Sequence, residues 1–158
     1  MSRWSDNEAA AMVASYPNDG EDLALRVYSS RLLGRDPSLV LHGGGNTSVK
    51  TTRTDELGRT LPVLCVKGSG WDLAEIEPAG HPAVHLPPLL DFRALEALSD
   101  EAMVNGVRRN LLSTASPNPS VETLLHAFLP HKYIDHTHAD SVLALANQEH
   151  AADLCRTV

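Results

Sequence analysis

Two histidines separated by one residue, His136 and His138, constrain the fold of this chain more than any other feature of its sequence. The short apolar run 133–134 leads into them and predicts a β-strand. Side chains at i and i+2 of a strand point to the same face, so we expect both imidazoles to project from one rigid element. Such a pair suits Zn²⁺ or a similar divalent ion, but it could equally be solvated or hydrogen-bonded to buried carbonyls.

The segment before this pair predicts a helix that carries a carboxylate. Ser120 would be its N-cap, Glu122 would lie in its first turn, and Pro130 would end it. A helix that opens with a glutamate, followed by a strand with two histidines, can bring a carboxylate and a metal to one place. Glu122 could also be only a favourable first-turn charge, and His126, four residues later, could simply pair with it.

Two glycine-rich loops are candidate anion-binding sites. Residues 43–45 are three consecutive glycines followed by Asn46, and residues 67–70 form a Lys-Gly-Ser-Gly loop after a predicted strand. Glycine frees the backbone for positive φ and for close approach to a ligand. Neither loop has the P-loop pattern, and either could be a plain turn. The two loops and Ser120 together favour a shared phosphate site more than any one of them does.

The order of predicted elements indicates the fold class. Helices are predicted over residues 6–16, 21–33, 91–98, 100–112, 120–129 and 140–156, and strands over residues 39–41, 47–54, 61–66 and 84–86. Gly34 is placed to follow the second helix as its C′ residue. Strands cluster in the middle of the chain and helices lie on both sides of them, which predicts an α+β fold rather than repeated βαβ units.

Composition excludes several classes of function. The chain has 158 residues, enough for one domain with a core, and a net charge of −7 with 4% aromatic residues, which argues against a nucleic-acid partner. The N-terminus lacks a signal-peptide pattern, and no apolar run is long enough to span a membrane. Cys65 and Cys155 match no zinc or redox motif. We therefore expect a cytoplasmic protein that binds neither nucleic acid nor membrane.

Taken together, the motifs resemble those of class II aldolases and adducin-like proteins. Residues 44–48, 67–70, 120–122 and 136–138 occur in the order found in that family, and the resemblance covers about Leu41 to Asn147. The chain is most similar to a branch in which an aldolase-like N-terminal region is fused to a short-chain dehydrogenase. The resemblance implies one domain over residues 1–158, at the N-terminal part of a longer chain. It also implies an α/β/α layered fold whose mostly antiparallel sheet is incomplete at the C-terminus.

The resemblance also implies roles for the candidate site residues. His136 and His138 would bind Zn²⁺ or another divalent metal, and Glu122 would move a proton as acid/base, for which a raised pKa is expected. Donors from five residues would bind the substrate phosphate: Gly45, Asn46, Ser69, Gly70 and Ser120. The reaction would cleave the C3–C4 bond of a ketose 1-phosphate, such as rhamnulose 1-phosphate, into dihydroxyacetone phosphate and an aldehyde. A homo-oligomer, commonly a tetramer in this family, is expected as well.

Two departures from the family pattern leave alternatives open. The family completes its metal site with a third histidine further downstream, for which His150 could substitute. Without it, residues 1–158 alone are expected to bind metal weakly and to be inactive. Val121 stands where aldolases often have a second hydroxyl residue, which loosens the phosphate assignment. A non-catalytic adducin-like assembly module, or a related metal-dependent decarboxylase or epimerase, is therefore the alternative, and NAD would enter only with a dehydrogenase region beyond these residues.

Overall fold

A computed structural model describes residues 3–157 of the chain. Its α-helices are α1 (Asp6–Ser15), α2 (Glu21–Gly34), α3 (Leu86–Asp91), α4 (Asp100–Arg109), α5 (Thr123–Phe128), α6 (Asp140–Ala146) and α7 (Ala151–Thr157). Its strands are β1 (Asn46–Thr54), β2 (Thr60–Val66), β3 (Ala83–His85) and β4 (Tyr133–His136), and two 3₁₀ turns, η1 (Pro78–Gly80) and η2 (Phe92–Ala94), complete the elements. No helix among the described residues is long and apolar enough to cross a membrane.

The four strands form one antiparallel sheet in the order β3-β2-β1-β4. β1 and β2 are joined as a hairpin, in which Thr54 pairs with Thr60. β4 arrives from the far end of the sequence and pairs with the first residues of β1, so that Asn46 lies opposite His136. This register brings the histidine strand beside the residues that follow the triple glycine.

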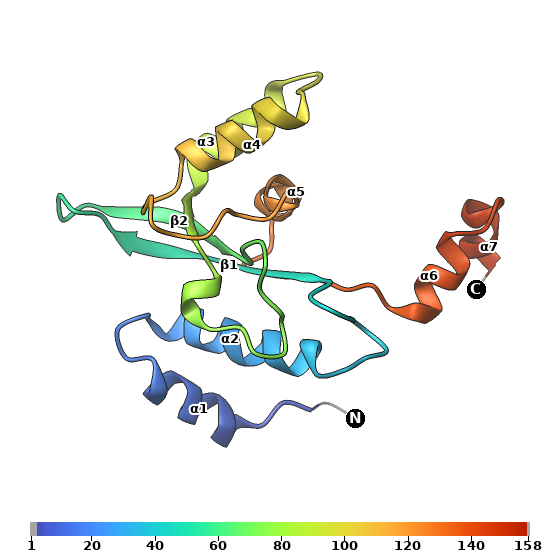
Figure 1. Ribbon diagram of the computed structural model, residues 1–158, viewed down its shortest axis with the longest axis horizontal. Coiled ribbons are helices and arrows are strands. Elements are labelled where there is room, and N and C mark those ends of the chain that lie inside the picture. The colour runs from blue at the N-terminus through green and yellow to red at the C-terminus, as the bar shows by residue number, and fades with distance from the viewer. Residues whose placement is uncertain (1–2, 158) are drawn as a thin grey trace.

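Helices cover both faces of the sheet (Figure 1). α1 and α2 lie on one face, while α5 and then α3 with α4 lie on the other. Alternate residues of β2 belong to two apolar cores, one on each face of the sheet, because side chains of a strand alternate between faces. Val63 and Cys65 pack with the α2 side, and Leu64 and Val66 pack with the α3–α5 side. The predicted α+β fold with an antiparallel sheet between helical layers is confirmed.

The last two helices project away from these layers (Figure 1). None of the residues of α6 and α7 that the structure describes is buried. The sequence predicts one helix over residues 140–156, but the chain turns at residues 147–150 and divides it in two.

Two other elements differ from the prediction. Residues 39–41 are not a strand but part of the loop between α2 and β1, although Val40 is buried there. The helix expected over residues 91–98 begins earlier, at Leu86, and continues only as the 3₁₀ turn η2. The prolines at 87 and 88 lie in its first turn, where the missing N–H groups would have had no helical partner.

Gly34 is the last residue of α2 rather than the C′ residue, and its lack of a side chain serves packing. A Cβ at this position would overlap the main chain of Leu73 and Ala74. We predict that Gly34→Ala lowers the free energy of unfolding by more than about 2 kcal/mol, although alanine is the better helix former. Gly106→Ala in α4 is the matched control, since its Cβ would meet only the movable ring of Phe92. Equal costs in urea unfolding would contradict this assignment.

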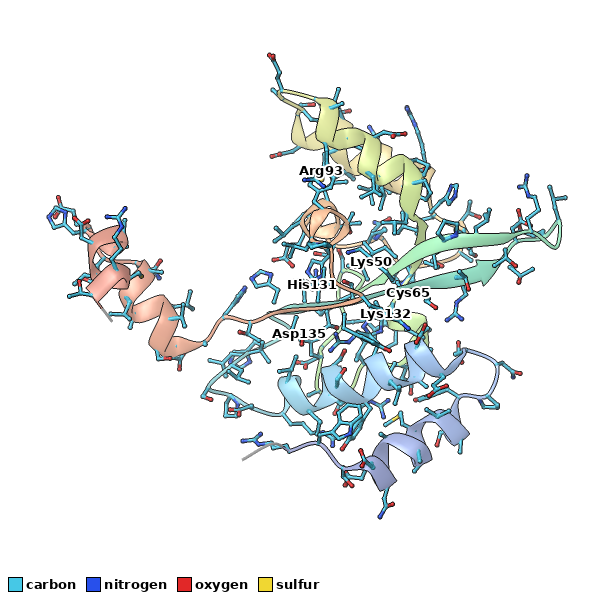
Figure 2. The ribbon with its side chains drawn as sticks, turned by 180° about the vertical axis from the view of Figure 1, so that it is seen from behind. Lys50, Cys65, Arg93, His131, Lys132 and Asp135 are labelled. Carbon is cyan, nitrogen blue, oxygen red and sulfur yellow. The ribbon has the colours of Figure 1, made fainter. Side chains whose placement is uncertain are left out.

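A buried polar chain crosses the layer between α2 and the sheet. Arg26 pairs with Asp135 of β4 at 2.6 Å, and Figure 2 shows Asp135 on the α2 side of its strand. The Thr47 hydroxyl lies 2.8 Å from the Ser30 hydroxyl and 3.1 Å from Nε2 of His81. Burial, with the Arg26 charge as a second cause, lowers the pKa of His81 to about 3.

This depressed pKa predicts a loss of stability in acid. As the pH falls, His81 takes up a proton in the unfolded chain before it does so in the folded chain. The stabilisation that neutral His81 provides is therefore complete above pH about 6.5 and is lost as the pH falls toward 3. The contribution of His81 should fall by about 2 kcal/mol between pH 7.5 and pH 5. We predict that His81→Gln flattens the profile of unfolding free energy against pH by this amount. Parallel profiles for the two proteins would show that His81 does not govern the loss.

Candidate active site

Glu122 lies in the turn that leads into α5. The helix begins at Thr123, three residues after the predicted N-cap, and Glu122 occupies the N-cap position itself. Ser120 instead shapes the turn: its hydroxyl accepts a hydrogen bond from the Glu122 N–H at 3.2 Å, and its carbonyl accepts one from the Thr123 N–H at 3.1 Å. The turn therefore places the Glu122 carboxylate at the N-terminal end of α5, and this end lies against the sheet.

The carboxylate of Glu122 meets two neighbouring strands. Asn46, the first residue of β1, donates from Nδ2 to Oε2 of Glu122 at 2.7 Å. Its cross-strand partner, His136, places Nδ1 3.0 Å from Oε1 of the same carboxylate. The pairing of β1 with β4 thus positions one group on each carboxylate oxygen.

His138 lies two residues after the end of β4, and a main-chain hydrogen bond fixes its position. Its N–H donates to the Leu39 carbonyl at 2.8 Å, which ties it to the loop before the glycines. The rings of His136 and His138 lie side by side, with centroids 4.9 Å apart and planes at 62°. A Cβ at Gly44 would stand 3.3 Å from Nδ1 of His138, so a glycine there leaves room beside the ring.

Glu122, His136 and His138 form a group that could hold a metal ion. One ligand atom from each residue lies within 4.8 Å of the others. Nδ1 of His136 is buried and has no aligned hydrogen-bond partner among the described residues, although Oε1 of Glu122 is close. Two imidazoles and a carboxylate are a donor set found in catalytic zinc sites, so the residues fit a divalent cation. His150 lies between α6 and α7, is exposed, and is not part of this group.

The pKa of Glu122 is lowered, whereas the sequence analysis expected a raised pKa. Burial alone would raise the pKa of this carboxyl, but the Asn46 hydrogen bond and the nearby His136 outweigh it and leave the pKa lowered. The expected raised pKa is therefore wrong for this arrangement. An ionised carboxylate is suited to accept a proton first and donate it later.

Three of the candidate phosphate ligands lie on two segments that run side by side. The Ser69 N–H donates to the Asn118 carbonyl at 2.9 Å, and the Ser120 N–H donates to the Lys67 carbonyl at 3.2 Å. These bonds bring the 67–70 loop against Ser120. They also use the main-chain donors of both serines, and the Ser120 hydroxyl donates to Oε2 of Glu122 at 3.4 Å, so the Ser69 hydroxyl and Gly70 are the groups left to face a ligand. Gly70 adopts φ +87° and has open space beside it.

The other two candidate phosphate ligands are engaged elsewhere. The Asn46 amide is directed to Glu122, and its Oδ1 is buried without a partner in the described part of the chain. Gly45, at φ +69°, lies where a Cβ would stand 2.9 Å from the His136 carbonyl. It therefore permits the loop to approach β4 closely. Their placement connects both residues to the Glu122–His136 pair more directly than to the Ser69–Ser120 surface.

Lys67 is a feature that the sequence analysis did not single out as a site residue. It is 8% exposed, and its ammonium donates to the Gly43 carbonyl at 2.7 Å, so it bridges the two glycine loops. Burial lowers its pKa, while the negative charges of Glu122 and Asp72 oppose that shift. The sequence did contain a signal for this role, because Lys67 lies at the end of a predicted strand and directly before Gly-Ser-Gly.

Comparison with known proteins identifies the family of this fold. The sequence matches the family described as the class II aldolase and adducin N-terminal domain over residues 25–157. It is 37% identical over 153 residues to a Bacillus subtilis protein named uncharacterized oxidoreductase YuxG, covering 97% of this chain and 21% of that protein. It also matches the solved N-terminal class II aldolase domain of a conserved protein from Thermoplasma acidophilum, with a TM-score of 0.80 and 44% identity.

The extent of these matches differs between the chains. The Thermoplasma structure is matched over 86% of this chain and 63% of its own, so the chain spans less than two thirds of either relative. The family match covers more than half of the chain and includes all four motifs that carry the resemblance. The chain therefore belongs to the class II aldolase and adducin N-terminal domain family.

Proposed function

We propose that the protein is a divalent-metal-dependent lyase that cleaves a ketose 1-phosphate, such as rhamnulose 1-phosphate, to dihydroxyacetone phosphate and an aldehyde. The observation that carries this proposal is the convergence of Glu122, His136 and His138, whose ligand atoms lie within 4.8 Å of one another. Partial burial of the Glu122 carboxylate beside two imidazoles has a desolvation cost that a fold that only assembles with partners would not need. This cost favours catalysis over an adducin-like assembly role.

The proposed roles follow from the contacts of each residue. His136 and His138 would hold the cation, Zn²⁺ being the first choice for imidazole ligands. When bound, the cation would act as a Lewis acid that stabilises the negative charge developing on the substrate oxygens. Glu122 would move the proton at its carboxylate, where Oε2 accepts the Asn46 hydrogen bond and Oε1 lies 3.0 Å from Nδ1 of His136.

The phosphate would bind over the paired 67–70 and 118–120 segments. Ser69, Gly70 and Ser120 would supply neutral donors there, and Lys67 would supply a buried positive charge close by. Because the Lys67 side chain is shielded from water, its charge attracts an anion more strongly than the charge of a fully solvated lysine would. Gly45 and Asn46 are assigned to this site by family resemblance only, and their contacts favour a role around Glu122.

Val121 favours a second candidate. Its side chain is 68% exposed beside Ser120 and offers no hydrogen-bond donor. A smaller set of donors suits a substrate without a phosphate, and a decarboxylase or epimerase would use the same cation and the same base. Identification of the product by NMR separates these reactions, since only the aldol cleavage releases an aldehyde.

We further propose that residues 1–158 are one domain at the N-terminal part of a longer protein that also contains an NAD-dependent short-chain dehydrogenase. Support comes from the Bacillus relative, which is named an oxidoreductase and of which the chain spans 21%. The dehydrogenase would process the aldehyde that the lyase releases. A cytoplasmic homo-oligomer, with a tetramer expected, completes the proposal.

The metal site is tested by the histidine pair. We predict that the full-length protein carries about one Zn²⁺ per chain and that His136→Ala combined with His138→Ala abolishes it, as measured by elemental analysis. The control is His131→Ala combined with His150→Ala, which removes two exposed histidines outside the group. Unchanged metal content in the His136 and His138 variant would rule out this site.

The role of Glu122 is tested separately from metal content. We predict that Glu122→Gln, assayed at saturating metal, keeps the cation but lowers kcat by about 10²–10⁴-fold, because the amide cannot accept the proton. Glu101→Gln, on the exposed side of α4, is the control and should behave as wild type. Normal turnover in Glu122→Gln would remove this residue from the mechanism.

A further inference from the structure

β1 and the α5 segment are joined by two hydrogen bonds at matched spacing. Asn46 and Ser48 lie two residues apart on β1 and therefore project from the same face of the sheet. The first bonds to Glu122, and the Ser48 hydroxyl lies 2.8 Å from Nδ1 of His126. Two residues of strand advance about 6.6 Å and four residues of helix advance about 6 Å, so both bonds can form without distortion.

The second of these bonds does not touch the candidate site. His126 is completely buried, and its main-chain N–H also donates to the Glu122 carbonyl at 3.2 Å. Its Nε2 is buried without a hydrogen-bond partner among the described residues. A leucine would remove the unpaired Nε2 but would leave the buried Ser48 hydroxyl without its partner, so the imidazole here does more than fill the core.

α5 needs an external anchor to hold its first residue in place. The helix has six residues, too few for its own hydrogen bonds to define a stable orientation. Leu125 on the helix and Leu129 directly after it are exposed, so apolar packing fixes only part of its surface. The bond from Ser48 to His126 lies one helical turn after Glu122 and restrains rotation of the helix about its axis.

We infer that His126 is a positioning residue, which acts through its hydrogen bond to Ser48 to set where the Glu122 carboxylate stands relative to His136 and His138. Asn46 holds the carboxylate itself, and His126 holds the helix that carries it. This inference rests on the proposed function for its kinetic consequences, but the arrangement of the two bonds is independent of the reaction.

Four substitutions separate positioning from general stability. Ser48→Ala and His126→Phe remove the hydrogen bond. His126→Asn keeps a polar atom close to the position of Nδ1, so it can still bond to Ser48. His126→Gln places its polar atoms nearer the position of Nε2 instead. In the full-length protein loaded with metal, we expect Ser48→Ala, His126→Phe and His126→Gln to lower kcat about 10- to 100-fold with KM within about twofold. His126→Asn should recover most of kcat. Equal activity of the Asn and Phe variants would overturn the inference.

A double-mutant comparison tests whether the effect passes through Glu122. In a Glu122→Gln background, Ser48→Ala should cause no further loss of kcat, because the group that it positions is already disabled. A multiplied loss in the double variant would show that Ser48 acts by another route. Ser48→Ala removes one oxygen atom, so this comparison holds even if His126→Phe does not fold.

A second readout needs no substrate. The protein is loaded with Co²⁺, whose visible absorption reports the ligands around it. We expect Ser48→Ala to shift this spectrum while the Co²⁺ stoichiometry stays at about one per chain, and to cause no shift when Glu122→Gln is already present. If no ketose 1-phosphate is cleaved by the wild type, the proposed function fails while this spectral shift still tests the inference. An unchanged spectrum in Ser48→Ala would overturn it.

Discussion

The pairing of β4 with the first residues of β1 is the interaction on which the candidate site depends. Asn46 lies opposite His136 in this register, and both side chains reach the Glu122 carboxylate from the α5 side. A slip of one residue would turn His136 to the α2 side, because strand side chains alternate between faces. On that face Arg26 pairs with Asp135 and donates to main-chain carbonyls of both strands, which opposes such a slip. The buried Arg26 guanidinium thus favours the observed register of the histidine strand through its contacts with Asp135 and with both strands.

Local patterns in the sequence predicted the parts of this arrangement that depend on spacing. The strands β1 and β2, the first two helices and the α+β class follow from periodicity and from the order of the elements, and the structure confirms them. The proximity of His136 and His138 was expected from an extended strand, although β4 ends at His136 and His138 is held by Leu39. The order of four short motifs indicated the family, because their combination is specific where each alone is weak.

Other features depend on contacts between distant segments and could not be read from local patterns. The lowered pKa of Glu122 arises from Asn46, 76 residues away in sequence. Lys67 reaches the Gly43 carbonyl across two loops, and its burial is a property of the assembled layers. The start of α3 at Leu86 was missed because two prolines suggest a break, whereas the first turn of a helix accepts them.

The central claim is that Glu122, His136 and His138 converge on one cation. Anomalous diffraction from crystals of the full-length zinc-loaded protein, recorded above and below the zinc absorption edge, tests it most directly. The account predicts one strong peak per chain, about 2.0–2.1 Å from a ring nitrogen of each histidine and within reach of the carboxylate. A peak bound by other residues, with none between these two rings, would contradict it.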